Sequence, residues 1–205
     1  MKLYYQTHSP YARKALVFAH EAGLAGRIEV IHHETSPTRR NATVFAENPL
    51  GKVPVLIRPG RAPIFDSDVI CAYLDTLAPE RRLIPQDGEA RWDALRLQAV
   101  AQGLCDAGIA LRWETVRRPP ELRYAALRDG YAEKLVASYD WLETALDMSG
   151  PIHVGHIALA TALDWILFRD LPSFRESRPR LTTWFDAFSL RPSMRATPLV
   201  GDTLD

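Results

Sequence analysis

Two serines stand where helices are predicted to begin, and an X-Pro pair lies between them in the chain. Ser9 precedes Pro10, a residue suited to the first position of a helix, and Ser67 opens a later segment with helical periodicity. A helix N-terminus presents unpaired N–H groups and a partial positive charge, so both positions suit an anion. If the fold brings them to one edge of a sheet, a ligand with two anionic ends would bridge them.

The pair Val53-Pro54 offers a different kind of contact. A residue before proline is held extended, which leaves the N–H and C=O of Val53 available to an extended peptide. Taken singly, Ser9 and Ser67 are typical of ordinary N-caps, and Val53-Pro54 is typical of a strand start. Their combination favours a site for an anionic, peptide-like ligand.

Strand and helix signals alternate over residues 1–77. We expect strands at 3–5 and 28–31, helices at 10–22 and 42–47, and a hairpin of residues 53–57 and 62–65 around Pro59-Gly60. A third helix starts at Asp66 or Ser67. Pro63 cannot donate to a ladder, which places the last strand at a sheet edge. The order β-α-β-α-β-β-α predicts a small mixed sheet backed by helices.

Strand signals disappear after a Pro- and Gly-containing linker at residues 78–88. We expect helices at 89–117, 122–148, 157–168 and 180–190. The first is one long helix or a pair, with Gly103 and Gly108 as positions where it can bend, and Arg191-Pro192 ends the last. Residues 157–168 are apolar almost all round, as in the buried centre of a helical bundle. The prediction is an α/β domain (1–77), a linker (78–88) and an all-α domain (89–205).

Composition narrows the class of partner. The 25 basic and 25 acidic residues cancel, which is a poor basis for binding nucleic acid. No apolar run reaches the roughly 20 residues of a membrane span, and the first residues lack the apolar core of a signal peptide. Two cysteines and six scattered histidines show no metal-ligand spacing. We therefore expect a cytoplasmic protein with no metal, nucleic-acid or membrane partner.

Three strings resemble the soluble glutathione S-transferase superfamily, and the resemblance extends over essentially the whole chain. They are Ser-Pro-Tyr-Ala-Arg-Lys at 9–14, Asn-Pro-Leu-Gly-Lys-Val-Pro-Val-Leu at 48–56 and Phe-Asp-Ser-Asp-Val-Ile-Cys-Ala-Tyr-Leu at 65–74. Residues 157–165 are similar to the central helix of that family. The resemblance implies a thioredoxin-like α/β N-terminal domain that binds glutathione, and an all-helical C-terminal domain that completes a pocket for an electrophile.

The resemblance also implies a role for each matching residue in binding glutathione. Val53 would pair with the cysteinyl backbone, with a cis bond to Pro54. Asp66 would hold the γ-glutamyl ammonium, and Ser67 with its helix N-terminus the γ-glutamyl carboxylate. Lys52 would face the glycyl carboxylate, with Arg39 or Arg40 as a further basic contact.

The resemblance also implies that the catalytic residue lies in the turn between the first strand and the first helix. Ser9 matches the serine-type, theta-like branch of the family, while the absence of cysteine there argues against the Cys-type branches. Tyr5, Tyr11 and Thr7 are neighbouring hydroxyls, and backbone donors alone are a further alternative. The implied activity is a homodimeric glutathione transferase whose Ser9 hydroxyl stabilises the thiolate. A non-catalytic glutathione-binding scaffold and a glutathione-dependent peroxidase or reductase are the alternatives.

Two departures from the family pattern bear on the helices. The acidic residue before Ser67 is Asp66 rather than the more common Glu, so its reach is shorter. His153-x-x-His156 replaces the usual Ser/Thr-x-x-Asp capping box. We expect these two histidines to cap the buried helix, with a weaker or pH-sensitive start, and His32-His33 to lie at the surface.

The electrophile pocket is less defined by the sequence. The long helix offers five candidate residues for this pocket. One of them, Trp113, is expected to pack in the core instead, as large aromatic side chains usually do. The others are Leu104, Gly108, Leu111 and Arg112.

Overall fold

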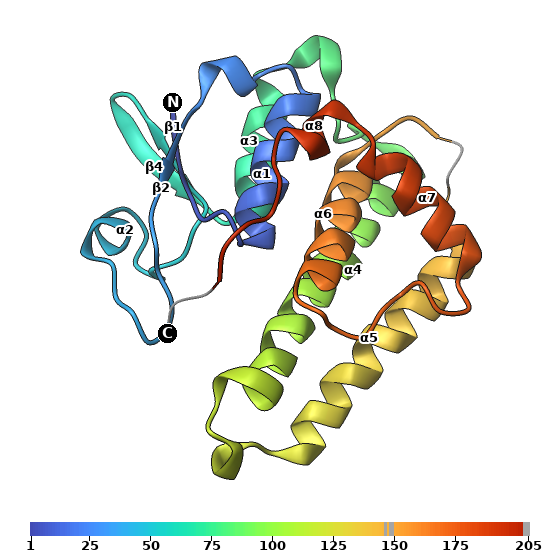
Figure 1. The fold of residues 1–205 in the computed structure, drawn as a ribbon. Helices are drawn as coiled ribbons and strands as arrows, with labels where there is room; N and C mark the ends of the chain where they lie inside the picture. The colour runs from blue at the N-terminus through green and yellow to red at the C-terminus, as the bar shows by residue number, and fades with distance from the viewer. Residues whose placement is uncertain (146, 148–149, 203–205) are drawn as a thin grey trace.

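A four-stranded mixed sheet forms the first layer of the molecule. The computed structural model describes residues 1–145, 147 and 150–202 (Figure 1). The strands are β1 (Lys2–Tyr5), β2 (Glu29–His32), β3 (Val55–Arg58) and β4 (Arg61–Phe65), in the order β2-β1-β3-β4. β1 runs parallel to β2 and antiparallel to β3. β4 lies at an edge, as Pro63 predicted.

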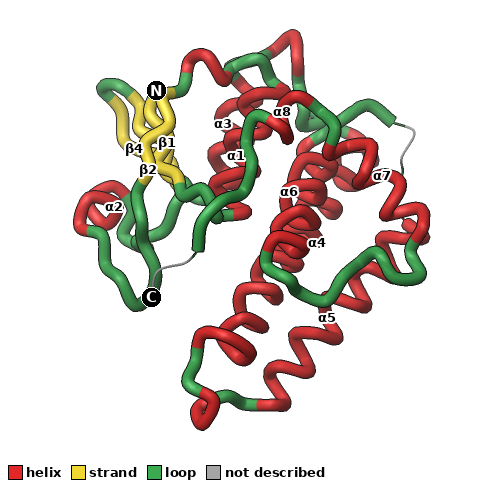
Figure 2. Tube along the Cα trace, viewed as in Figure 1, coloured by secondary structure: helices red, strands yellow, loops and turns green. Residues whose placement is uncertain are grey.

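Three helices accompany the sheet: α1 (Pro10–Glu21), α2 (Ala42–Glu47) and α3 (Ser67–Thr76). Figure 2 shows α1 and α3 between the sheet and the larger helices, with α2 on the far side of the strands. Leu3 and Tyr5 alternate inward from β1 and pack in the core with α1 and α3. This is the predicted thioredoxin-like α/β domain.

The second layer is helical, as predicted. It contains α4 (Gly88–Arg112), α5 (Ala125–Ala145), α6 (Val154–Phe168), α7 (Pro179–Ser189) and the short α8 (Pro192–Arg195). α6 is buried along nearly its whole length at the centre, which explains why it is apolar all round. Shorter helical turns are Ala25–Arg27, Pro79–Arg81 and Pro120–Leu122, and a π-helix spans Trp113–Arg117.

Several helix ends differ from the sequence prediction. The helix expected at 89–117 is one α-helix to Arg112 and then a π-helix, and neither Gly103 nor Gly108 divides it. The helix expected at 122–148 begins at Ala125, and Met148 lies outside the described residues. α7 ends at Ser189, just before Arg191-Pro192 as predicted, but it is not the last helix, because Pro192 begins the short α8 at the helix position that suits proline.

The connection at residues 78–88 is packed against both layers. The Asp75 carboxylate accepts the N–H groups of Leu83 and Ile84 at 2.7 and 3.1 Å, and Leu83 and Ile84 are buried. The Leu83 carbonyl in turn accepts the N–H of Val154 at the start of α6, at 2.8 Å. The segment therefore fixes α6 relative to α3.

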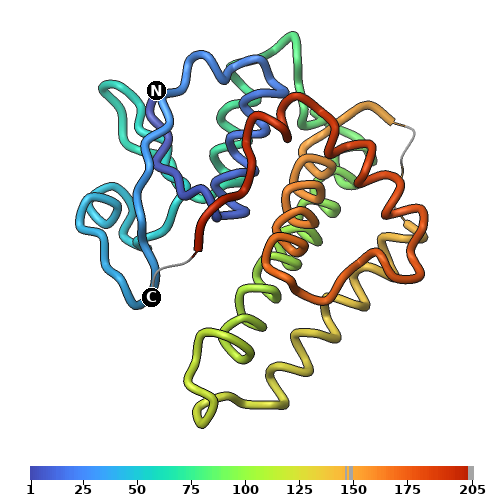
Figure 3. The backbone as a smooth tube through the Cα atoms, in the orientation of Figure 1, coloured from blue at the N-terminus to red at the C-terminus, as the bar shows by residue number. Residues whose placement is uncertain are grey.

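Two buried clusters stabilise the molecule. The first combines the sheet, α1 and α3 with Val154, Ile157 and Ala160 of α6. The second lies among α4, α5, α6 and α7. Figure 3 shows the chain returning after α8 from the helical layer to the N-terminal domain. α6 therefore contributes to both cores and is the main structural link between the layers.

Candidate active site

Ser9 caps α1 from the end of the β1–α1 loop. Its backbone is extended (φ −89°, ψ 120°), and its Oγ accepts the N–H of Ala12 at 3.2 Å. The residue is 8% exposed. Among the described residues, the Ser9 hydroxyl has a partner as acceptor and none as donor. Its O–H is therefore available to a ligand at the start of the helix.

Asp66 and Ser67 form the start of α3. The Asp66 carboxylate accepts the N–H of Asp68 at 2.7 Å, and Asp66 has φ +69°, a conformation that non-glycine residues seldom adopt. Such backbone strain is often found at ligand-binding positions. The Asp66 side chain is exposed, whereas Ser67 is buried at the first helical position.

Contacts between helices bring these two starts together. The Lys14 ammonium of α1 contacts the Asp68 carboxylate of α3 and donates to Gln102 of α4 at 3.0 Å. The Tyr11 phenol donates to the Asp106 carboxylate of α4. The N-termini of α1 and α3 therefore lie at one edge of the domain, facing α4, as the two predicted anion positions require.

The neighbouring tyrosines are engaged elsewhere. Tyr5 packs in the first core, where burial raises its pKa to about 12. Burial raises the pKa of Tyr11 further, with the charges of Cys105 and Asp106 and the hydrogen bond to Asp106 acting in the same direction. Both phenols are therefore neutral at physiological pH.

The Val53–Pro54 peptide bond is cis. Val53 lies just before β3, whose pairing with β1 begins where Val55 pairs with Tyr4. The turn before it depends on Gly51, because its φ is +62° and a Cβ there would lie 2.2 Å from the Phe45 ring. Asn48 Nδ2 donates to the Lys52 carbonyl at 2.9 Å, which closes the turn. The Lys52 side chain points to solvent.

The two arginines proposed as a further basic contact lie on an exposed loop. Backbone hydrogen bonds between Ser36 and Arg39 close this loop, and the Arg40 guanidinium stacks 3.8 Å over the Phe45 ring. Thr35 Oγ1 donates to the Gly51 carbonyl at 2.9 Å. The loop with Arg39 is thereby tied to the loop with Lys52.

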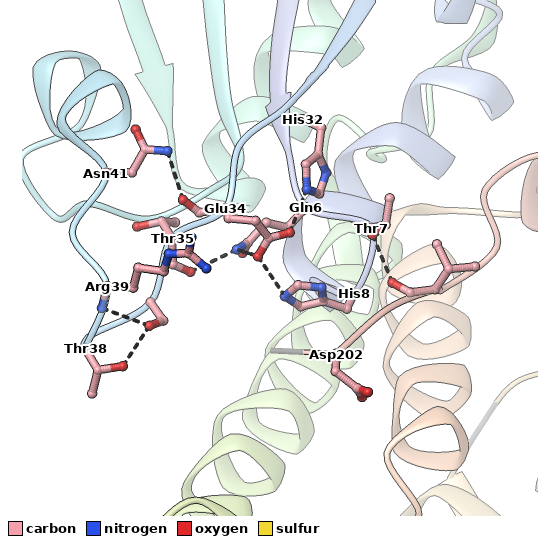
Figure 4. A network of polar contacts seen from close by, with 12 residues as sticks. Gln6, Thr7, His8, His32, Glu34, Thr35, Thr38, Arg39, Asn41 and Asp202 are labelled. Carbon is pink, nitrogen blue, oxygen red and sulfur yellow. Dashed lines mark hydrogen bonds and ion pairs between the residues drawn. The ribbon is translucent and has the colours of Figure 1, made fainter. Parts of the chain in front are cut away.

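A polar network beside Ser9 has no counterpart in the sequence prediction. Figure 4 shows Gln6, His8 and His32 converging on the Glu34 carboxylate. Gln6 Nε2 donates to it at 3.0 Å, and the Nε2 atoms of His32 and His8 lie at 2.6 and 3.8 Å. Burial lowers the pKa of His8, although the Glu34 charge opposes this. The parallel pairing of β1 with β2 is the signal that would have placed residues 6–8 beside 33–35.

The C-terminal segment also reaches this turn. The Val200 N–H donates to the Thr7 carbonyl at 3.2 Å, and Thr7 Oγ1 donates to the Val200 carbonyl at 2.9 Å. Figure 4 shows Asp202 on this segment below His8. Residues 200–202 therefore border the site.

The predicted electrophile-pocket candidates on the long helix separate into two groups. Leu104 and Leu111 are buried in the second core, and Gly108 packs against Trp165. Trp113 is half-buried beneath the Arg117 guanidinium, 4.0 Å above its ring, and lies outside both core clusters. Its predicted core position is therefore wrong.

Two of the histidines lie where the sequence predicted, His153 at a helix cap and His32 at the surface. His153 Nδ1 accepts the N–H of Gly155 at 3.2 Å, which confirms the predicted cap for His153. His156 does not cap the helix: it lies inside α6 and stacks on His153. His32 is exposed, as predicted. Among residues 1–145, 147 and 150–202, no group of three or more metal-ligating side chains is placed to hold a metal ion. No helix in the same part of the chain is both long and apolar enough to span a membrane.

Comparisons with known proteins agree with this geometry. Residues 8–77 match the family model for the N-terminal domain of glutathione S-transferase. A glutathione transferase family member from Pseudomonas fluorescens Pf-5, crystallised with bound glutathione, is 35% identical over 98% of this chain and 99% of its own, with a TM-score of 0.93.

Two curated relatives are more distant. The uncharacterized GST-like protein YibF of Escherichia coli is 29% identical over 96% of this chain and 98% of its own length. Glutathione S-transferase omega-1 of Sus scrofa is 24% identical over 96% of this chain and 79% of its own. These relatives do not include a theta-class protein, so the comparisons leave the predicted serine-type branch unassigned.

Proposed function

The chain belongs to the glutathione S-transferase superfamily, and we propose that it transfers glutathione to small electrophiles by stabilising the thiolate with the Ser9 hydroxyl. The observation that carries this proposal is the geometry of Ser9. The Ser9 Oγ caps α1 by accepting the N–H of Ala12, and its hydroxyl hydrogen can still be donated to a ligand. The glutathione bound to the similar Pseudomonas protein supports glutathione as the ligand.

One hydroxyl at the start of a helix can supply the free energy needed to lower the pKa of the glutathione thiol. A cysteine-like thiol has a pKa of about 8.5, so only about 3% is ionised at pH 7. Lowering that pKa by about two units takes about 2.7 kcal/mol. A hydrogen bond to a charged group contributes roughly 1.5–3 kcal/mol, and the helix N-terminus about 0.3–2 kcal/mol. Ser9 acts as a donor to the sulfur, and the thiol proton leaves to solvent.

The surrounding residues are proposed to hold the rest of glutathione. Val53, outside the β3 ladder, pairs with the cysteinyl backbone, next to the cis bond to Pro54. Asp66 binds the γ-glutamyl ammonium, and Ser67 with the α3 N-terminus binds its carboxylate. Lys52 and Arg39, on two loops joined through Thr35 and Gly51, supply positive charge for the glycyl carboxylate.

The protein's own thiols do not compete for this role. Cys71 and Cys105 are both buried, and burial raises the pKa of each to about 12. Neither forms a thiolate at neutral pH. This supports a serine-type mechanism, although curated relatives of this chain carry the omega name. A homodimer in the cytoplasm is the assembly and location we propose with it.

Replacing the hydroxyl tests the proposal. In Ser9→Ala, we expect kcat/KM for conjugation of 1-chloro-2,4-dinitrobenzene to fall by about 10- to 150-fold, the loss of roughly 1.5–3 kcal/mol of hydrogen bonding to an anion. Glutathione affinity, measured by calorimetry, should change little, because Val53, Asp66 and Ser67 remain.

Ser9→Thr is the matched control, since it keeps both the hydroxyl and an N-cap oxygen. It should retain most of the activity. Equal activity of Ser9→Ala and wild type would contradict the role of Ser9 and favour backbone donors. Glutathione binding without conjugation by the wild type would favour the scaffold alternative, and turnover of peroxide or disulfide alone would favour the peroxidase or reductase.

A further inference from the structure

Strand pairing sets the distance between two of the proposed glutathione contacts, Val53 and Asp66. In the β3–β4 ladder, Val55 pairs with Phe65. Val53 lies two residues before Val55, and Asp66 directly follows Phe65. The sheet therefore holds these two contacts together, independently of the neighbouring loops.

Ser9 is not held to that pair by the sheet. The pairing of β1 with β3 ends where Tyr4 pairs with Val55. Residues 6–9 lie beyond the end of β1 and lead into α1. Strand pairing therefore stops before Ser9, and other contacts must set the distance between Ser9 and Val53.

A chain of hydrogen bonds through two buried side chains, those of Gln6 and Thr35, bridges this gap (Figure 4). The Ser9 N–H donates to the Gln6 carbonyl at 3.1 Å, and Gln6 Nε2 donates to the Thr35 carbonyl at 2.9 Å. Thr35 Oγ1 in turn donates to the Gly51 carbonyl at 2.9 Å, and Gly51 lies two residues before Val53. The chain therefore runs from the backbone of Ser9 to the loop that presents Val53.

The other contacts of this turn lead to the helical layer. The Thr7 carbonyl accepts the Val200 N–H at 3.2 Å, and the His8 carbonyl accepts Trp165 Nε1 at 3.1 Å. These two hydrogen bonds hold the turn against α6 and the C-terminal segment, and neither connects it to the loop of Val53. The chain through Gln6 and Thr35 thus has a role that they do not share.

The distance between Ser9 and Val53 matters because one cysteinyl residue of glutathione is proposed to reach both. Its sulfur accepts the Ser9 hydroxyl hydrogen while its backbone pairs with Val53, and a single CH₂ group joins the sulfur to that backbone. Such a short connection cannot compensate for a misplaced partner. A hydrogen bond weakens steeply away from its preferred length and angle, so a small displacement of Ser9 is costly.

We infer that Gln6 and Thr35 are positioning residues, whose side-chain hydrogen bonds hold the Ser9 hydroxyl at the distance from Val53 that one cysteinyl residue spans. This inference rests on the proposed transferase function and adds two residues that act through Ser9 and Val53 rather than on the substrate. Gln6 Nε2 also donates to the Glu34 carboxylate at 3.0 Å, which fixes the carboxamide in the orientation that reaches Thr35.

Thr35→Val tests the inference, because it removes the hydroxyl and nearly keeps the shape of the side chain. We expect the pKa of the bound glutathione thiol, followed by the ultraviolet absorbance of its thiolate, to rise by about 0.5 to 1. At pH 6.5, kcat/KM with 1-chloro-2,4-dinitrobenzene should fall by about 3- to 10-fold, as for the loss of one neutral hydrogen bond. Affinity for S-methylglutathione, measured by calorimetry, should change little, because the sheet still holds Val53 against Asp66.

Two controls separate positioning from a general loss of stability. Thr35→Ser keeps the hydroxyl and should restore the thiol pKa and the activity of the wild type. Thr183→Val, on α7, also removes a hydroxyl that donates to a backbone carbonyl, at 2.8 Å, and should leave the thiol pKa unaltered. Gln6→Met breaks the preceding link of the chain and should act as Thr35→Val does. A wild-type thiol pKa in both Thr35→Val and Gln6→Met overturns the inference.

The double variant Ser9→Ala/Thr35→Val separates this inference from the transferase proposal. If Thr35 acts by placing the Ser9 hydroxyl, Thr35→Val should raise the thiol pKa no further once that hydroxyl is absent. An equal rise in both backgrounds overturns positioning through Ser9. A raised thiol pKa in Ser9→Ala but not in Thr35→Val overturns this inference alone and leaves the transferase proposal standing, whereas a wild-type thiol pKa in Ser9→Ala removes both.

Discussion

Ser9 and His153 each cap a helix with a side-chain acceptor, but only the imidazole can lose that role by gaining a proton. His153 Nδ1 accepts the Gly155 N–H, and a protonated ring would carry hydrogen on that nitrogen. Burial lowers the pKa of His153 to about 4, and the stacked His156 acts in the same direction, while Asp147 and Asp93 oppose it. The cap of α6 is therefore built for the neutral ring.

The consequence is a loss of stability in mild acid. The unfolded ring has an ordinary pKa of 6.5 and the folded one a lower value, so the unfolded state binds more protons between pH 6.5 and about 4. The contribution of His153 is complete above pH 6.5 and is lost as the pH falls toward 4. His153→Ser keeps a cap without titrating there, so its urea midpoint should fall less between pH 7 and 5 than that of the wild type. Equal losses in the two proteins would contradict this.

The cysteines give a second test at the scale of single residues. Because Cys71 and Cys105 are buried with pKa values raised to about 12, native protein should not react with 5,5′-dithiobis(2-nitrobenzoate) at pH 8. Reaction should become complete in guanidinium chloride. Rapid labelling of folded protein would show that one of the two helices carrying them opens readily.

Individual roles were predictable where they depend on local sequence. The caps by Ser9 and His153 follow from short strings. The Gln6–His8–Glu34 network was missed, because it depends on the pairing of β1 with β2 and not on any spacing within one segment.

At the scale of elements, the two glycines within α4 differ in the space around them. A Cβ on Gly108 would lie 2.7 Å from Trp165 and 2.9 Å from Leu171, whereas a Cβ on Gly103 meets no atom within 4 Å. Gly108 is therefore needed for the close approach of α4 to α6. Gly103 has no such constraint.

Alanine at each position separates the two cases. Gly103→Ala should raise the free energy of unfolding by about 0.5–1 kcal/mol, because alanine favours the helix. Gly108→Ala should lower it by about 1–3 kcal/mol, since overpacking outweighs that gain. Urea unfolding followed by tryptophan fluorescence measures both. The same sign of change in the two variants would contradict the packing described for α4 and α6.

Element type and order were predictable from periodicity, and the ends of elements were less so. The apolar stripe of residues 157–168 identified the central helix, but its first turn begins at Val154 because a histidine can act as a cap. The π-helix after Arg112 has no sequence signal of its own, and Trp113, its first residue, lies outside the expected core.

At the scale of the whole molecule, Arg13 joins three distant segments. Its guanidinium contacts the Asp164 carboxylate of α6, and it donates to Thr197 Oγ1 at 3.4 Å and to the Met194 carbonyl at 3.3 Å. Arg13 is fully buried at the junction of the two domains. The string Ser-Pro-Tyr-Ala-Arg-Lys thus carries a structural residue beside the proposed catalytic one.

Arg13→Leu should lower the free energy of unfolding by about 2–3 kcal/mol. This is less than the 3–5 kcal/mol typical of breaking a buried ion pair, because the Asp164 side chain is 34% exposed. Chemical denaturation measures the loss, and Arg195→Leu, on the exposed surface of α8, is the control. A variant as stable as the control would show that the domains are held by apolar contacts alone.

The arrangement of the domains was the least predictable feature. The resemblance implied which domains are present, but the contact of Val200 with Thr7 depends on packing between segments far apart in the chain. Boundaries at residues 77 and 88 stay predictions, since the first core includes residues on both sides of them.

Proton release on glutathione binding tests the central claim most directly. Calorimetric titration at pH 6.5, in two buffers of different ionisation enthalpy, counts the protons that leave when the thiol enters the site. We predict saturable binding with release of about half a proton by the wild type, as expected for a thiol whose pKa is lowered to about 6.5, and much less by Ser9→Ala. Binding of equal strength without proton release would contradict activation of the thiol by Ser9.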